Sequence, residues 1–102
     1  MGEQETARMR NDAELVADYA RSASKEAFSE IVRRHGDMVY RCCLRVLGDA
    51  HAAEDAAQAV FLIPIQRPRM LKGTRNLGAW LHAVARKTAL KASRSASCRE
   101  RY

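Results

Sequence analysis

The chain has 102 residues with an apolar content of 47%, which suits one domain with a small hydrophobic core. Its net charge of +6 is unevenly placed: residues 1–61 carry eight Lys and Arg against eleven acids, a balance of −3, whereas residues 62–102 carry ten against one, a balance of +9. A field concentrated in one half of a chain favours a polyanionic partner, nucleic acid above all, over an ordinary solvated basic surface.

Composition also argues against several classes of protein. The acidic N-terminal segment has no hydrophobic run and is no secretory signal. The longest uncharged run, residues 56–66, is shorter than the roughly 20 residues of a membrane-spanning helix. Cys42, Cys43 and Cys98 show no Cys-x-x-Cys spacing, and the first two are expected to be small buried hydrophobes. We therefore expect a soluble, cytoplasmic protein with no membrane partner, no metal and no cofactor.

The N-terminal half predicts three helices. Asp12 is a candidate N-cap of a first, short helix. Ser24 can cap a second helix, and Gly36 suits a left-handed stop at its end. Asp37 can then start a third helix that ends at Gly48. The expected inward side chains are Leu15, Val16, Tyr19, Phe28, Ile31, Val32, His35, Val39, Cys42, Cys43 and Val46.

The C-terminal half predicts two more helices. The first covers about residues 50–62, and Pro64 must end or kink it because proline lacks the amide donor. Proline and glycine then keep residues 64–78 irregular, and the last helix begins near Gly78 or Ala79. The expected inward side chains of the two helices are Ala53, Ala56, Ala57, Val60, Phe61, Leu81, Val84, Ala85 and Thr88.

No segment shows the sustained alternation of a β-strand. We therefore predict an all-α fold, a compact bundle of four to five helices over residues 12–94. Residues 1–11 are expected to be a flexible N-terminus, and residues 95–102 a frayed basic tail.

Catalytic chemistry has little support in this sequence. It contains no phosphate-cradling glycine loop, no His-Glu-x-x-His and no Gly-x-Ser-x-Gly. Glu54 and Asp55 are adjacent, so they diverge around a helix and cannot act as a general acid–base pair. His35, His51 and His82 fall on separate predicted helices, and His35 is expected to close an apolar stripe. We predict a protein that is not an enzyme and has no catalytic residue.

Residues 64–94 offer the chemistry of nucleic-acid binding. Trp80 is either a stacking platform for an unpaired base or a core residue, and the two interpretations are about equally supported. Asn76 lies in a loop that suits a base pulled out of a duplex, although the loop can also be a simple connector. The cations expected to neutralise phosphates are Arg67, Arg69, Lys72, Arg75, Arg86, Lys87, Lys91 and Arg94.

The helix predicted over residues 50–62 carries a different surface, marked by Glu54, Asp55 and Gln58. Asp55 and Gln58 are three apart and are therefore neighbours on the helix surface. They can pair with Arg side chains and backbone groups of a partner helix. Without the basic half beside it, this segment would be interpreted as a solvated face.

Four ordered stretches of the chain carry a resemblance to a known family. They are Ala27-Phe28…Ile31-Val32-Arg33-Arg34-His35, Val39-Tyr40…Leu47-Gly48-Asp49, Ala53-Glu54-Asp55…Gln58…Phe61-Leu62, and Trp80-Leu81…Val84-Ala85-Arg86…Ala89-Leu90…Arg94. In this order they resemble region 2 of the sigma-70 family of bacterial transcription initiation factors, most closely the extracytoplasmic-function type. The similarity covers roughly residues 12–94.

The resemblance implies two partners. The helix with Glu54, Asp55 and Gln58 would bind the clamp coiled coil of the largest catalytic subunit of core RNA polymerase. The loop over residues 64–78 and the Trp80 helix would melt and read the minus-ten element of promoter DNA, and capture a flipped non-template base. An anti-sigma factor is a further implied partner, and the polymerase would perform the chemistry.

The chain departs from the family pattern at several places. Ala59, counted with the polymerase-binding residues, stands where Glu is usual, so the clamp contact is expected to be weaker. Pro64 and Pro68 interrupt a segment that is usually helical. Lys87 and Lys91 stand where Asn and Asp are usual, which is expected to raise non-specific affinity for DNA. The sequence ends where a linker and region 4 would follow, so region 4 is expected to be absent.

Three alternatives therefore stand beside the initiation factor. The first is a truncated, sigma-like interaction protein that binds polymerase or an anti-sigma factor without initiating transcription. The second is an unrelated basic helical domain that binds nucleic acid. A basic amphipathic helix for anionic membranes is a weaker third.

Overall fold

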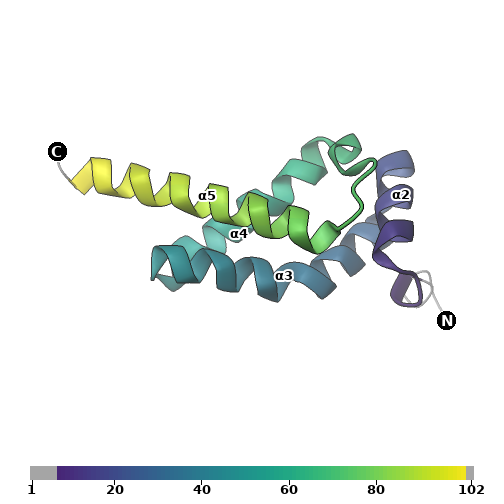
Figure 1. The fold of residues 1–102 in the computed structure, drawn as a ribbon, viewed down its shortest axis with the longest axis horizontal. Coiled ribbons are helices and arrows are strands. Elements are labelled where there is room, and N and C mark those ends of the chain that lie inside the picture. The colour runs from purple at the N-terminus through teal and green to yellow at the C-terminus, as the bar shows by residue number, and fades with distance from the viewer. Residues whose placement is uncertain (1–6, 101–102) are drawn as a thin grey trace.

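The computed structural model describes residues 7–100 of the chain, and the side chains of residues 7–95. This part of the chain folds into the helices α2 (Asp12–Ser22), α3 (Lys25–Leu47), α4 (Ala50–Gln66) and α5 (Leu77–Glu100), with a short 3-10 helix, η1 (Pro68–Leu71), before α5. Figure 1 shows α2 standing across the end of the bundle where α5 begins, while α5 projects past the other helices towards the C-terminus. The prediction of an all-α bundle is confirmed.

The helix α2 begins one residue earlier than expected. Its N-cap is Asn11, whose side-chain oxygen accepts a hydrogen bond from the amide of Glu14 at 2.9 Å, and Glu14 Oε1 accepts one from the amide of Asn11 at 3.2 Å. Such a reciprocal capping box satisfies two amides that a helix start leaves unpaired. Asp12, the expected cap, uses its carboxylate elsewhere. Leu15, Val16 and Tyr19 are buried as predicted.

One continuous helix, α3, replaces the two that were predicted on either side of Gly36. Gly36 does not adopt a positive φ, and the helix runs through it to a left-handed stop at Gly48, which has φ 70°. The apolar stripes before and after Gly36 are in phase, since Ile31 and Val39 are both buried on the same side. A single internal glycine costs about 1 kcal/mol relative to alanine, less than the burial of both stripes contributes. The predicted stop at Gly36 was wrong for this reason.

The helix α4 does not end at Pro64 but continues to Gln66. The Pro64 ring is fully buried, and its carbonyl oxygen accepts a hydrogen bond from the hydroxyl of Tyr19 at 2.9 Å. In a continuing helix that carbonyl would accept from the amide of residue 68, but residue 68 is a proline with no N–H. Tyr19, which belongs to α2, therefore supplies the donor that the chain cannot provide locally.

The segment expected to be irregular, residues 64–78, is helical at both ends. The turns of η1 bury Leu71, and only residues 67 and 72–76 of this segment lack a helix. The side chain of Asn76 accepts a hydrogen bond from the amide of Ala79 at 3.0 Å, so α5 starts at Leu77, earlier than Gly78. The helix continues to Glu100. The expected fraying of residues 95–102 stays a prediction, and residues 101–102 lie outside the described part.

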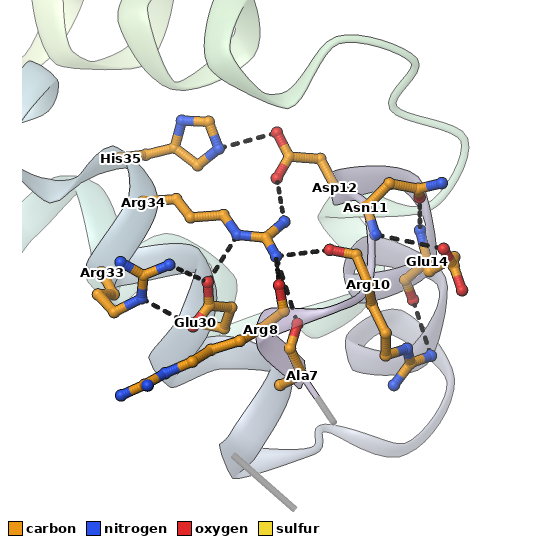
Figure 2. A network of polar contacts seen from close by, with 10 residues as sticks. All are labelled: Ala7, Arg8, Arg10, Asn11, Asp12, Glu14, Glu30, Arg33, Arg34 and His35. Atoms are coloured by element: carbon orange, nitrogen blue, oxygen red, sulfur yellow. Dashed lines mark hydrogen bonds and ion pairs between the residues drawn. The ribbon is translucent and has the colours of Figure 1, made fainter. Parts of the chain in front are cut away.

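A network of polar contacts fastens the segment before α2 to α3. Figure 2 shows Arg34 of α3 reaching that segment, where its guanidinium donates to the carbonyl oxygens of Ala7, Arg8 and Arg10 at 3.3, 3.0 and 2.5 Å. The same guanidinium contacts Asp12 at 3.1 Å. Residues 7, 8, 10 and 12 are therefore in contact with α3. The expected flexibility of residues 1–11 stays a prediction, and residues 1–6 lie outside the described part.

The core lies where the sequence predicted it. Leu81, Ala85, Val60 and Ala53 are almost completely buried between α3, α4 and α5. Cys42 and Cys43 are buried free thiols, which confirms the prediction of small buried hydrophobes. Burial raises the pKa of the Cys43 thiol, which keeps it protonated and unreactive. The side chain of Cys98 is not among those described.

Candidate protein-docking and nucleic-acid surfaces

The acid-marked surface of α4 is open to solvent. Glu54, Asp55, Gln58 and Ala59 are all exposed, as the proposed contact with another protein requires. Asp49 caps the helix by accepting a hydrogen bond from the amide of Ala52 at 2.8 Å, which fixes the start of the helix that carries these residues. Their role as polymerase-binding residues stays a prediction.

A shallow apolar groove of about 520 Å³ runs beside these residues, between α3 and α4. Leu62 and Ile65, which line it, are 45% and 50% exposed, a large fraction for aliphatic side chains. Glu54 and Gln58 line the same groove, so it joins an apolar floor to polar groups. Sequence reasoning did not select Ile65. The signal was present, because the apolar residues of α4 extend around more of the helix than one core-facing stripe needs.

The predicted DNA-binding cations are all exposed. Those of the loop and η1 are Arg67, Arg69, Lys72 and Arg75, and those of α5 are Arg86, Lys87, Lys91 and Arg94. Because their side chains are exposed, each of these cations is accessible to a phosphate. Their contact with DNA stays a prediction.

Trp80 and Asn76 also have structural roles. Trp80 is partly buried and packs against the hydrophobic core, which is the core role considered for it, with part of the ring left accessible. Asn76 is the N-terminal cap of α5, so its side-chain oxygen is already occupied by an amide. One acceptor position of this oxygen is therefore used by the cap, and the base-holding role of Asn76 stays a prediction.

Arg21 was missed by sequence reasoning. Two hollows of about 780 and 770 Å³ lie between α2 and the segment from Arg67 to Arg75, and Arg21 lines both. It sits in the acidic half of the chain, next to Asp18, and nothing local marks it as part of a basic surface. Only the folded arrangement places α2 beside η1.

The most strongly perturbed carboxylate, Glu30, belongs to the network in Figure 2. Its carboxylate accepts hydrogen bonds from Arg33 at 2.9 and 2.6 Å and from Arg34 at 2.6 Å, while the side chain is only 5% exposed. The hydrogen bond with Arg33, aided by Arg34, lowers the pKa of Glu30 to about 2 against the opposing effect of burial. The Glu30 carboxylate is paired with Arg33 and Arg34, and neither it nor these two arginines line the groove or the hollows, so the cluster is structural.

His35 does not close an apolar stripe as predicted. Its Nε2 lies 2.9 Å from Oδ2 of Asp12, and the ring joins the network that holds the N-terminal segment (Figure 2). His51 and His82 are exposed.

Among the described residues, no three His, Cys, Asp or Glu side chains come close enough together to hold a metal ion. No helix in the described range is long and apolar enough to cross a membrane.

The arrangement is that of a helical domain with an acid-marked, partly apolar surface on one helix and a basic surface on another. The family model for sigma-70 region 2 matches residues 31–98. The chain belongs to this family.

Three relatives agree with that assignment. The chain is 32% identical over 65 residues to the ECF RNA polymerase sigma factor SigW of Bacillus subtilis, covering 64% of this chain and 35% of the relative. It is 33% identical over 67 residues to ECF RNA polymerase sigma factor SigE of Mycolicibacterium smegmatis, with coverages of 61% and 24%. It is 35% identical over 81 residues to ECF RNA polymerase sigma factor SigL of Mycobacterium tuberculosis, with coverages of 78% and 46%. The chain thus spans less than half the length of each, and no solved structure matches it significantly.

Proposed function

We propose that this chain is a transcription initiation factor domain that binds core RNA polymerase through α4 and opened promoter DNA through the basic loop and α5. The observation that carries the proposal is the separation of two exposed surfaces of opposite chemistry within a sigma-70 region 2 domain. One combines Asp55 and Gln58 with the apolar groove at Leu62 and Ile65, and the other gathers the cations of the loop and α5.

The polymerase contact is assigned to the surface around Asp55. A helix of the clamp coiled coil can place aliphatic side chains on Leu62 and Ile65, and Arg side chains against Asp55 and Gln58. Interfaces of this kind need an apolar centre with polar groups around it. With Ala59 in place of a second acid, the apolar groove carries a larger share of this affinity.

The DNA contact is assigned to the basic surface. Phosphates of the melted minus-ten element lie on Lys87, Lys91 and the loop cations, and the accessible part of Trp80 stacks on a base. Lysines at positions 87 and 91 add charge without base recognition, so binding is strong and weakly selective. The polymerase supplies the catalytic residues.

Two double variants test the contribution of each surface to binding separately. Asp55→Ala/Gln58→Ala is expected to weaken pull-down by core polymerase while leaving DNA affinity unchanged, and Lys87→Ala/Lys91→Ala is expected to weaken DNA binding while leaving pull-down unchanged. If Asp55→Ala/Gln58→Ala leaves polymerase binding unchanged, the chain is a basic nucleic-acid binder and the proposal fails. A promoter-dependent transcription assay with purified core polymerase completes the test: binding without transcripts would favour a sigma-like interaction protein.

A further inference from the structure

Large apolar side chains that remain exposed are concentrated on two neighbouring surfaces. Of the four among the described residues, Leu62 and Ile65 line the α3–α4 groove, and Met70, which is 48% exposed, lines a hollow beside α2. The fourth, Met9, precedes α2. Exposed apolar side chains that gather in this way mark surfaces that another molecule covers. The groove and the hollow are therefore candidate contact surfaces.

The two hollows beside α2 share Ala20, Arg21 and Arg69, so they adjoin and together form the α2 hollow. Its lining on α2 is mainly alanine, and no aromatic ring lines it among the described residues. None of these lining residues is acidic, and five are cations: Arg21, Arg67, Arg69, Lys72 and Arg75. An occupant therefore needs carboxylates for the rim and aliphatic side chains for the floor.

The exposed side of α4 has the opposite character. Glu54 is the one charged residue among the described residues that line the α3–α4 groove, and Asp55 stands exposed beside it. Leu62 and Ile65 follow on the same side, so α4 joins carboxylates to aliphatic side chains. No other described helix carries exposed large aliphatic side chains on the same surface as acids. This α4 surface complements the α2 hollow in both charge and polarity.

The two surfaces also match in length. The lining of the α2 hollow extends along α2 from Ala13 to Ala23, which spans about 15 Å at a helical rise of about 1.5 Å per residue. The exposed side of α4 from Glu54 to Ile65 spans about 16 Å. The alanine side chains of the hollow are short, so they let a second helix approach α2 closely.

Arg21 is available to a carboxylate from outside. Its side chain is 78% exposed, and its ion pair with Asp18 at 3.1 Å is of the solvent-accessible kind that contributes little. If Arg21 turns away, Asp18 keeps Arg10 at 3.0 Å and stays compensated. The rim can therefore pair with a new acid without leaving one of its own acids unpaired.

We propose that this chain associates with itself, so that the α4 surface of one copy occupies the α2 hollow of another. Glu54 and Asp55 lie against the cations of the rim, and Leu62 and Ile65 cover the alanine floor. This contact goes beyond the proposed function, because it needs neither polymerase nor DNA. It places the polymerase-binding residues of one copy on the loop cations of the other, so the contact withholds both from their other partners.

Sedimentation velocity of the 102-residue chain, freed of nucleic acid, measures the association over a range of protein concentrations. Raising the salt from about 0.1 M to about 1 M shortens the screening length from about 10 Å to about 3 Å and is expected to weaken association about tenfold. Glu54→Lys/Asp55→Lys and Arg69→Glu/Lys72→Glu each place like charges opposite one another, so each is expected to weaken association about 100-fold. None of these four side chains forms an ion pair within the described residues, so the replacements remove no such contact from the fold.

A mixture of the two charge-reversed variants provides the sharpest test. The lysines of the first variant then face the glutamates of the second, so the mixture is expected to associate although each variant alone does not. Both variants keep a net positive charge, because each changes the +6 of the chain by four units, and overall attraction therefore cannot cause the association. Lys87→Glu/Lys91→Glu makes the same change of net charge on α5, outside the groove and the hollow. This matched control is expected to associate like the wild type.

Three outcomes would overturn the inference. The first is a wild-type chain that stays monomeric at every concentration. The second is a control, Lys87→Glu/Lys91→Glu, that weakens association as much as Arg69→Glu/Lys72→Glu does, because the hollow would then have no special part. The third is a mixture of the two variants that stays monomeric although thermal melting shows both to be folded. None of these results changes the binding of the wild type to polymerase or DNA, and a failed polymerase pull-down with self-association intact would remove the proposed function alone.

Discussion

Replacing Tyr19 with Phe removes one oxygen atom and is expected to destabilise the whole domain. The hydroxyl of Tyr19 donates to the carbonyl oxygen of Pro64 at 2.9 Å, across 45 positions of sequence. Tyr19 is 4% exposed and the Pro64 ring is fully buried, so water has little access to a carbonyl left unpaired there. Since Pro68 has no amide hydrogen, no backbone donor can replace the lost one.

The expected magnitude follows from the unpaired acceptor. Leaving a buried carbonyl unsatisfied costs about 1–3 kcal/mol, and we expect about 2 kcal/mol for Tyr19→Phe. The aromatic packing is unchanged, because the ring that contacts Phe28, with centroids 5.1 Å apart, is retained. For a domain of this size the loss corresponds to a fall in Tm of about 10 °C.

Denaturant and thermal unfolding measure the effect, with Tyr40→Phe as the control. Tyr40 is partly exposed in the α3–α4 groove and its hydroxyl makes no hydrogen bond within the described residues, so its replacement is expected to change stability by less than about 0.5 kcal/mol. Equal losses for Tyr19→Phe and Tyr40→Phe would refute the reasoning.

High pH tests the burial of the same side chain. Burial raises the pKa of Tyr19 above its ordinary 10.0, so the folded state favours the protonated phenol. The contribution of Tyr19 is therefore fully present below pH 10 and is lost as the pH rises beyond it. Tyr19→Phe is expected to lack this alkaline loss, which unfolding measured at several pH values would show.

The remaining predictions concern charge and backbone conformation. Glu30→Gln is expected to cost about 2 kcal/mol of unfolding free energy at pH 7, measured by urea unfolding. Because the pKa of Glu30 is lowered on folding, the wild type loses this contribution as the pH falls from about 4.5 towards about 2. A variant with the same acid dependence of stability as the wild type would contradict this. Gly48→Ala places a Cβ at φ 70° where nothing crowds it, so backbone strain alone is expected to cost about 1 kcal/mol, seen as a lower Tm. Ala23→Gly is expected to have the opposite sign and stabilise by about 0.5 kcal/mol, since Ala23 ends α2 at φ 54°; a lower Tm for this variant would exclude strain as the cause.

The sequence was sufficient for the helical class and most of the core, because apolar periodicity is a local signal that tertiary packing preserves. It failed at residues that ordinarily break helices. Gly36 sits between two in-phase stripes, and their burial outweighs its conformational cost. Pro64 lies within the last turn of α4, where its carbonyl is bonded by Tyr19, and no reading of residues 60–68 alone could reveal a donor on another helix.

For the candidate surfaces, too, some features could be predicted from the sequence and others could not. Charged residues such as Asp55 and Lys87 were predicted to be exposed because ions are rarely buried unpaired, and they are exposed. Grooves depend on which helices meet, so the hollow that brings Arg21 beside Arg69 could not be predicted before α2 was placed against η1. Asn76 is an intermediate case, since its spacing to Ala79 is that of a helix cap and the sequence contained the signal.

The α3–α4 groove and the basic loop meet at the end of α4. Ile65 lines the α3–α4 groove, Arg67 lines the hollow beside α2, and Pro64 accepts the Tyr19 hydroxyl next to both. Residues this close at the end of α4 have a set separation, so a protein in the groove and DNA on the basic loop are held at a set distance from one another. A factor that presents opened DNA to polymerase needs that fixed geometry, whereas a general nucleic-acid binder does not. Tyr19→Phe loosens this turn without altering either surface, so in the purified transcription assay below its Tm it is expected to reduce promoter opening more than it reduces binding to polymerase or to DNA alone. Equal reductions in all three would show that the shared turn contributes stability and nothing more.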